Sequence, residues 1–309
     1  MLRRSLLYLS EQPRIFSFVR GNALARRLAS RFVAGETMDT AVVAVRELNG
    51  RGISASLDLL GESVTSAAEA RASAGTVIEL FRRIAAERLD CNVSVKLTQL
   101  GLDLDAALCA TNVRGILDQA REAGIPLRID MESSAHTQRT LDLFEKELLP
   151  AYGDLVGIVI QSYLRRSAAD VDRLIAARAR VRLCKGAYQE PATVAFPVKA
   201  DVNRSYVELM EMLLEHGHQP AVATHDPTLI AHARRFVERK GIAAERFEFQ
   251  MLYGIRRDLQ QDLRKAGFRV RVYVPFGTQW YPYLMRRLAE RPANIAFFLG
   301  NVVKESLHP

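Results

Sequence analysis

Residues 272–294, VYVPFGTQWYPYLMRRLAERPAN, bring together side chains that could bind an anion. Their pattern predicts a strand, a turn at Gly277, and a helix from about Gln279 to Arg291. At about 100° per residue, one stripe of that helix carries Tyr283, Arg286, Arg287 and Glu290. Two adjacent guanidinium groups suit a carboxylate or a phosphate. However, Arg-Arg pairs also start at positions 3, 26, 82, 165, 234 and 256, so this pair needs support from the rest of the chain.

A second set of polar side chains lies near the ends of predicted strands. In the run 126–133 an apolar register (127, 129, 131) alternates with a polar one (128, 130, 132), and the other runs behave alike. Strands buried on both faces usually read as continuous apolar runs, so a polar group on every strand favours a large polar ligand over a polar core. The polar residues, one from each predicted strand, are Asp58, Lys96, Asp130, Gln161, Arg182, Thr224, Gln250 and Tyr273.

The elements that would position these side chains alternate regularly after Gly52. The predicted strands are 53–61, 92–100, 126–133, 155–163, 180–188, 220–226, 247–254 and 268–276. The predicted helices between them are 66–89, 103–123, 135–149, 167–179, 200–217, 227–240 and 255–266. Eight such alternations predict a (β/α)8 barrel. A doubly wound open sheet is the alternative, but no Gly-rich phosphate turn follows the first run.

The chain ends and helix ends give further expectations. Residues 1–50 read as N-terminal helices that pack on the barrel, which would occupy residues 51–309. Four predicted helices end in REAG, LEHG, ERKG and RKAG, which predicts left-handed caps at the final glycines. These are Gly124, Gly217, Gly241 and Gly267.

Composition narrows the function classes. A chain of 309 residues with 49% hydrophobic and 25% charged residues is typical of a soluble, well-cored protein. Its three widely spaced cysteines offer no disulfide framework, which favours a reducing cytoplasmic location. The formal charge of +8 is spread along the chain with no block of five or six basic residues, which argues against a nucleic-acid partner.

The residues offer little chemistry without a cofactor. No Asp, Glu or His cluster has metal-ligand spacing, and His225 is expected to be a hydrogen-bond donor and not a metal ligand. No GxSxG elbow or Cys/His pairing marks a nucleophile. Lys96 and Lys185 could form Schiff bases, but the lysine in CKGAY also suits a phosphate or flavin contact. Many polar donors without a nucleophile or metal indicate that a cofactor carries the chemistry.

Several ordered motifs then resemble one family. SLDLLGE, SVKL, IDME, RLCKGAY, ATHD, FEFQMLYG and YVPFGTQWYPYLMRRLAE are similar to proline dehydrogenase, in its monofunctional bacterial type. The resemblance runs from Leu57 to Asn294 in the right order. It implies a distorted (β/α)8 barrel with FAD at the C-terminal ends of its strands. The implied reaction oxidises L-proline to Δ1-pyrroline-5-carboxylate and passes electrons to a membrane quinone.

The same resemblance implies roles for individual residues. Arg286 and Arg287, helped by Lys96, would bind the substrate carboxylate, while Tyr273 and Tyr283 would wall the proline ring. Asp130 would hold Tyr273 or an arginine in place. The implied FAD-binding residues are Gln161, Arg182, Lys185, Gly186, Ala187, Thr224, His225 and Gln250. Two positions depart from the family pattern. Other members have a hydrophobic or aromatic residue in place of Gln189 and Asn in place of Asp226.

Other expectations and alternatives stay open at this point. Glu62 in the first strand-to-helix loop is expected to pair with one of the two arginines as a lid, and Glu290 to anchor them. The resemblance also implies contact with the inner face of the cell membrane and hand-over of product to a separate pyrroline-5-carboxylate dehydrogenase, but it sets no oligomeric state. A Schiff-base lyase, a folate-linked flavin reductase and a non-catalytic basic binding protein are the alternatives.

Overall fold

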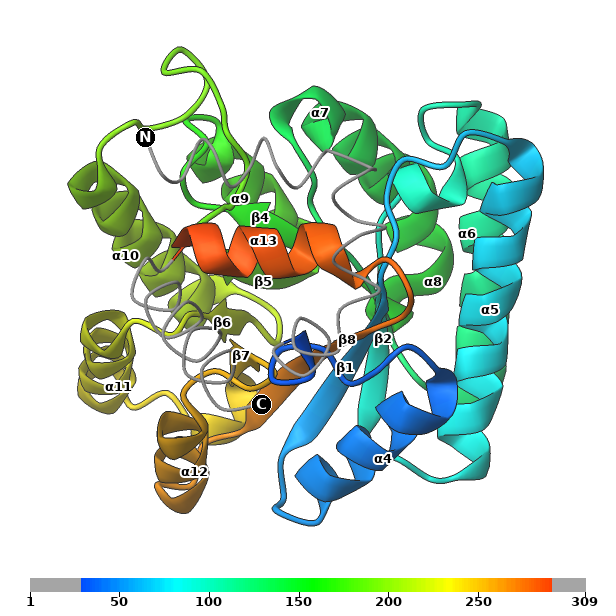
Figure 1. Cartoon of the computed structure of the whole chain (residues 1–309). Helices are drawn as coiled ribbons and strands as arrows, with labels where there is room; N and C mark the ends of the chain where they lie inside the picture. The colour runs from blue at the N-terminus through cyan, green and yellow to red at the C-terminus, as the bar shows by residue number, and fades with distance from the viewer. Residues whose placement is uncertain (1–28, 291–309) are drawn as a thin grey trace, which may run out of the picture.

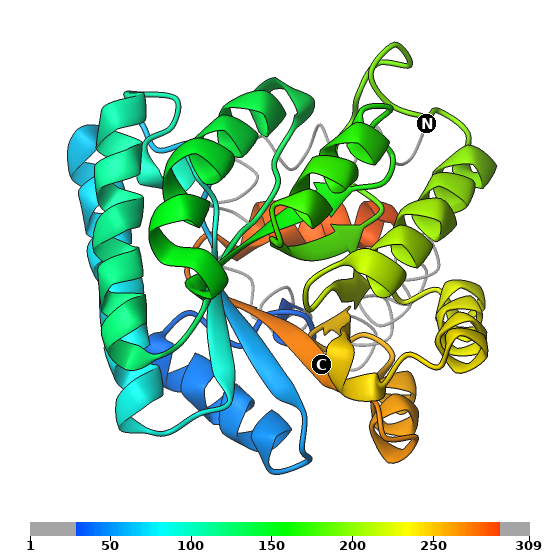
Figure 2. The ribbon, with the colours of Figure 1, turned by 180° about the vertical axis from the view of Figure 1, so that it is seen from behind.

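The computed structural model describes residues 29–290, except for the side chains of Arg286 and residues 288–290. Eight parallel strands close into a barrel in sequential order, as the sequence predicts. Figures 1 and 2 show the barrel from opposite sides, with helices around it. The strands are β1 (Ser54–Leu59), β2 (Cys91–Val95), β3 (Leu127–Ile129), β4 (Val156–Gln161), β5 (Arg180–Cys184), β6 (Ala221–Ala223), β7 (Glu248–Leu252) and β8 (Val270–Phe276).

The described α-helices match the predicted alternation, with one at the N-terminal side and one after the last strand. They are α4 (Met38–Asn49), α5 (Ala67–Ala86), α6 (Ala106–Ala123), α7 (Ser134–Leu143), α8 (Leu149–Tyr152), α9 (Ser167–Ala176), α10 (Lys199–His216), α11 (Pro227–Lys240), α12 (Arg257–Lys265) and α13 (Trp280–Glu290). In Figure 1, α13 lies across the front of the barrel. Among residues 29–290, none of these helices is long and apolar enough to cross a bilayer.

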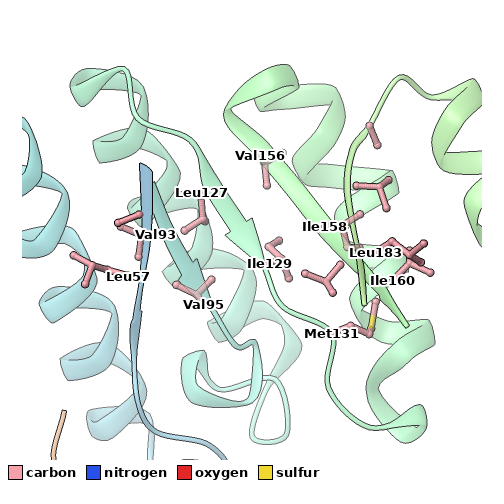
Figure 3. Packing of buried hydrophobic residues seen from close by; sticks show 14 of the residues in the cluster. Leu57, Val93, Val95, Leu127, Ile129, Met131, Val156, Ile158, Ile160 and Leu183 are labelled. Carbon is pink, nitrogen blue, oxygen red and sulfur yellow. The ribbon is translucent and has the colours of Figure 1, made fainter. Parts of the chain in front are cut away.

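The apolar register of the strands forms the core. Leu57 pairs with Val93, Val93 with Leu127, and Leu127 with Val156, so these side chains follow one another around the barrel. All of them are fully buried in the main hydrophobic cluster together with apolar residues of the surrounding helices. Figure 3 shows this part of the cluster on β1 to β5. The alternation therefore leaves the polar register facing the barrel interior.

One local prediction was wrong and another holds with a local irregularity. Residues 135–149 are helical as predicted, but a π-helix (Phe144–Leu148) separates α7 from α8. Pro150 follows at the start of α8 and has no backbone N–H to donate, so a regular helical ladder cannot run through it. Gly217 is extended at φ −75° and does not adopt the left-handed conformation. Its N–H bonds to the carbonyl oxygen of Leu213, and Gln219 takes the positive φ two residues later.

One helix of the expected N-terminal region is among the described residues. Helix α4 begins with a capping box at Thr37 and buries Val45 and Leu48 in the main cluster. Helices expected before Ala29 lie outside the described residues. The division at residue 50 stays a prediction.

Candidate functional site

One cavity of about 620 Å³ opens at the C-terminal ends of the strands. Every strand contributes to it the polar residue that the sequence analysis singled out, either from within the strand or from the position directly after it. Convergence of these eight side chains on one cavity is therefore confirmed. They are Asp58, Lys96, Asp130, Gln161, Arg182, Thr224, Gln250 and Tyr273.

A buried ion pair lies at the β1 and β2 side of the cavity. The Lys96 ammonium donates to both carboxylate oxygens of Asp58, at 2.9 and 3.0 Å, and the two side chains are 8% and 1% exposed. Burial alone would lower the pKa of Lys96, but the neighbouring carboxylates, first of all Asp58, raise it above its ordinary value. Lys96 is therefore a fixed cation and a poor amine nucleophile.

Beside this pair, a hydrogen-bonded network joins β3, β5 and β8. Asp130 accepts from the Arg182 guanidinium on Oδ1 and from the Tyr273 hydroxyl on Oδ2, both at 2.7 Å. The Arg182 guanidinium carbon lies 5.3 Å from the Tyr273 ring centroid. Burial, together with the Asp130 carboxylate, raises the pKa of Tyr273 well above its ordinary value, so the phenol keeps its proton.

Arg182 also reaches deeper into the barrel. Its second terminal nitrogen donates to the hydroxyl groups of Ser94 at 3.1 Å and Ser56 at 3.4 Å. These hydroxyl groups lie 3.0 Å from each other. The two serines and Asp130 thus fix the orientation of the guanidinium plane at the floor of the cavity.

Helix α13 adds two residues from above. Tyr283 and Arg287 line the cavity, and the Arg287 guanidinium carbon lies 5.1 Å from the Tyr283 ring centroid. Spacing of four residues places both on one helix face, as predicted. The side chains of Arg286 and Glu290 lie outside the described residues, so their roles and the pairing of an arginine with Glu62 stay predictions.

The loop after β5 supplies Lys185, Gly186 and Ala187 to the cavity wall. Lys185 donates to Asp226 at 2.9 Å. Gly186 has φ +106°, and a Cβ on it would overlap the ring of Tyr163. Only glycine fits this combination of backbone and neighbour, so the loop passes the cavity as bare backbone.

The loop after β6 forms the adjoining wall. Here the Nε2 atom of His225 accepts from the backbone N–H of Leu252 at 2.8 Å, which puts the proton of the neutral ring on Nδ1. The donor role expected of His225 therefore falls to Nδ1 and stays a prediction. Asp226 caps α11 by accepting from the N–H of Thr228, so the helix N-terminus faces the cavity beside Lys185.

The donor set fits a large, anionic, hydrogen-bonding cofactor such as FAD. Gln161 uses its amide nitrogen on the carbonyl oxygens of Met131 and Glu132, while its buried Oε1 has no partner among residues 29–290. Lys185, the α11 N-terminus and the bare backbone at Gly186 suit a pyrophosphate. Gln161, Gln250 and Thr224 offer neutral polar groups to a flavin ring.

Some cavity residues received no role from the sequence. Asp58 was identified as a polar strand residue. It lies near the end of β1, beside β2, and Lys96 directly follows β2, so this position could have marked Asp58 as the partner of Lys96. Tyr188 ends the KGAY motif and could have been carried over with it. Leu252 and Lys199 also line the cavity, but apolar strand ends and exposed lysines are too common to carry a signal.

Comparisons with known proteins agree on one family. The family model described as Proline dehydrogenase matches residues 41–298. Proline dehydrogenase 1 of Bacillus subtilis (strain 168) is 42% identical over 306 residues, which cover 99% of this chain and all of the relative. The proline dehydrogenase of Deinococcus radiodurans is 43% identical and covers 98% of both chains.

A larger solved protein shares the fold. Proline utilization A (PutA) from Bdellovibrio bacteriovorus, in a structure inactivated by N-propargylglycine, superimposes with a TM-score of 0.80 and 28% identity. The match covers 85% of this chain, which spans 32% of that larger protein.

Proposed function

This chain belongs to the proline dehydrogenase family, and from that premise we propose that it oxidises L-proline to Δ1-pyrroline-5-carboxylate with FAD as the hydride acceptor. The observation that carries the proposal is the cavity where polar residues of all eight strands meet Arg287 of α13. The fixed cations at one side suit a carboxylate, and the donors at the other suit a dinucleotide.

The substrate carboxylate binds Lys96, Arg286 and Arg287 in this proposal. Lys96 gives two of its three N–H bonds to Asp58 and keeps one for the substrate. Tyr273 and Tyr283 wall the ring, and the bond from Tyr273 to Asp130 fixes the first of these walls. Such fixed side chains hold the reacting carbon in one orientation and exclude water.

FAD would be held by Gln161, Arg182, Lys185, Gly186, Ala187, Thr224, His225 and Gln250. When bound, its flavin ring accepts a hydride and gains negative charge. Arg182 is anchored by Asp130, Ser94 and Ser56 before the reaction starts, so it stabilises that charge without reorganising.

The ring amine of proline must also give up a proton. Both oxygens of Asp130 accept from Arg182 and Tyr273, and both oxygens of Asp58 accept from Lys96. Because these two cavity carboxylates are committed to their partners, we assign the acceptor role to water at the cavity mouth.

Electron transfer to a membrane quinone and hand-over of the product to a separate pyrroline-5-carboxylate dehydrogenase complete the proposal. A cytoplasmic protein that touches the inner face of the membrane would meet both partners. The buried pair of Lys96 with Asp58 argues against a Schiff base on Lys96, because that reaction needs a neutral amine.

The test is the absorbance spectrum of the purified protein. We expect a flavin band near about 450 nm, as for oxidised flavins in general. Anaerobic L-proline should bleach this band, and folates and NADH should not. A colourless protein would contradict the cofactor, and bleaching by NADH alone would favour the flavin reductase.

Asp58→Asn should change the pH profile of kcat/KM for L-proline. Without the Asp58 charge, burial lowers the pKa of Lys96, so the amine loses its proton and its grip on the carboxylate as pH rises. We expect an alkaline limb at least about one pH unit below that of the wild type. Asp172→Asn, on the exposed face of α9, is the matched control. A profile that superimposes on the wild type would rule out this role.

Gly186→Ala should lose the cofactor. The added methyl group meets the Tyr163 ring on a backbone that L-residues avoid, so the loop that lines the cavity must shift. We expect a flavin-to-protein ratio reduced by more than half in the purified variant. Gly115→Ala, in open space on α6, should keep the wild-type ratio, and equal ratios in both variants would contradict the assignment.

A further inference from the structure

An N-terminal segment outside the barrel crosses the loop between β8 and α13. We call residues 29–36 the N-terminal strap. The N–H of Ala34 donates to the carbonyl oxygen of Pro275 at 2.9 Å, and the N–H of Gly277 donates to the carbonyl oxygen of Gly35 at 3.0 Å. These bonds fasten the strap to both sides of the turn between β8 and α13.

A second loop makes room for the strap. Gly254, the last residue of the FEFQMLYG motif, has φ +74°, and a Cβ on it would overlap the carbonyl oxygen of Arg31. The strap therefore lies against bare backbone of the β7–α12 loop. This contact gives a physical reason for the glycine that ends a motif otherwise assigned to the cofactor.

The strap also packs against α13. Its residues Ala29, Phe32 and Val33 form a separate apolar cluster with residues of that helix. The helix members of the cluster are Trp280, Tyr281, Tyr283, Leu284 and Met285. At about 100° per residue, Leu284 and Met285 lie on the side of the helix away from the stripe of Tyr283 and Arg287.

One polar contact fixes the start of the helix. Trp280, the first residue of α13, donates its indole N–H to Oε1 of Glu36 at 2.9 Å. Its side chain is 2% exposed, and it is the only tryptophan of the chain. A hydrogen bond to a carboxylate is stronger and more directional than apolar packing. It therefore fixes the position of α13 along and around its own axis, which packing alone does not.

The same helix carries Tyr283 and Arg287 into the cavity. A shift of α13 along or around its axis moves the Arg287 guanidinium relative to Lys96, which is fixed to the barrel by Asp58. Misplacement of a binding group by about 1 Å can cost about 10²-fold in rate. The position of the strap therefore affects the distance between Arg287 and Lys96, which together form the proposed carboxylate site.

We propose that Glu36, through its bond to Trp280, is a positioning residue for substrate binding: the N-terminal strap sets where α13 places its arginines. The inference rests on the proposed function, because its effect is measured as the KM for L-proline. It adds a determinant of substrate affinity that touches neither substrate nor cofactor.

Glu36→Ala in the full-length holoenzyme tests the proposal. We expect the KM for L-proline to rise about tenfold, as for loss of a bond to a charged group, with kcat and flavin content within about twofold of wild type. Glu36→Gln keeps the acceptor oxygen and should restore most of the affinity. Glu47→Ala, an exposed carboxylate of α4, should leave KM unchanged.

A second readout does not depend on turnover. Because Trp280 is the only tryptophan, its fluorescence reports the strap contact directly, and Glu36→Ala should increase quenching by acrylamide while Glu47→Ala should not. Trp280→Phe removes the N–H but keeps a ring, so it should raise KM as Glu36→Ala does, and the double variant should be no worse than either.

The outcomes separate the two claims. A wild type whose flavin L-proline does not bleach would refute the proposed function itself. An active wild type with unchanged KM in both Glu36→Ala and Trp280→Phe would refute the role of the strap. Additive effects of the two substitutions would also refute it, because partners in one bond cannot lose it twice.

Discussion

Arg287→Met raises the KM for L-proline by about one to two orders of magnitude while FAD stays bound, if Arg287 holds the substrate carboxylate. A charge-assisted contact to a ligand contributes about 1.5–3 kcal/mol, and more when it is shielded from water, which corresponds to this range. Arg287 lines the cavity beside Tyr283, and its guanidinium lies against the phenol ring. Steady-state kinetics with L-proline, together with the flavin-to-protein ratio, measures both halves of the expectation.

Two further variants sharpen this result. Arg286→Met is expected to raise the KM in the same way, because the sequence places Arg286 on the same helix stripe as Arg287. The double variant should have a higher KM than either single variant. Arg235→Met removes an exposed guanidinium from α11 and should change nothing. Wild-type KM in both Arg287→Met and Arg286→Met would put the carboxylate site elsewhere.

Arg182→Met slows anaerobic reduction of the flavin by L-proline by about 10²- to 10³-fold, the cost of removing one preorganised donor from developing charge. The substitution also leaves Asp130 without its cationic partner, so the variant should be less stable. Stopped-flow absorbance at saturating L-proline measures the rate, and thermal unfolding measures the stability.

Arg182→Lys separates charge from geometry. The ammonium keeps the positive charge but cannot reach Asp130, Ser94 and Ser56 together, as the guanidinium does. We expect an intermediate rate of flavin reduction. Equal rates in the wild type and Arg182→Met would show that this cation does not act on the reaction.

The sequence predicted the barrel and its polar cavity because both depend on periodicity. The alternation of Leu127 and Ile129 with Arg128 and Asp130 already assigns one register to the core and one to the interior. Closure of the sheet then forces one polar residue from each strand to the same end. No long-range information is needed for this step.

Other features depend on contacts that periodicity does not contain. Asp58 binds Lys96 across 38 positions of sequence, and its role appears only when β1 and β2 lie side by side. The left-handed cap expected at Gly217 is absent. The chain leaves α10 in an extended conformation at Gly217 and takes its positive φ at Gln219, a choice that the helix sequence itself does not encode. The bond from Trp280 to Glu36 spans 244 positions, and no local pattern marks either residue.

Flavin reduction by L-proline is the most direct measurement of the central claim. The purified protein should show an oxidised-flavin band, and anaerobic L-proline should bleach it within a single turnover, whereas Arg287→Met should need about 10- to 100-fold more L-proline for the same rate. A flavin band that L-proline leaves intact would contradict the proposed reaction, and its bleaching at the wild-type concentration dependence in Arg287→Met would contradict the assigned site.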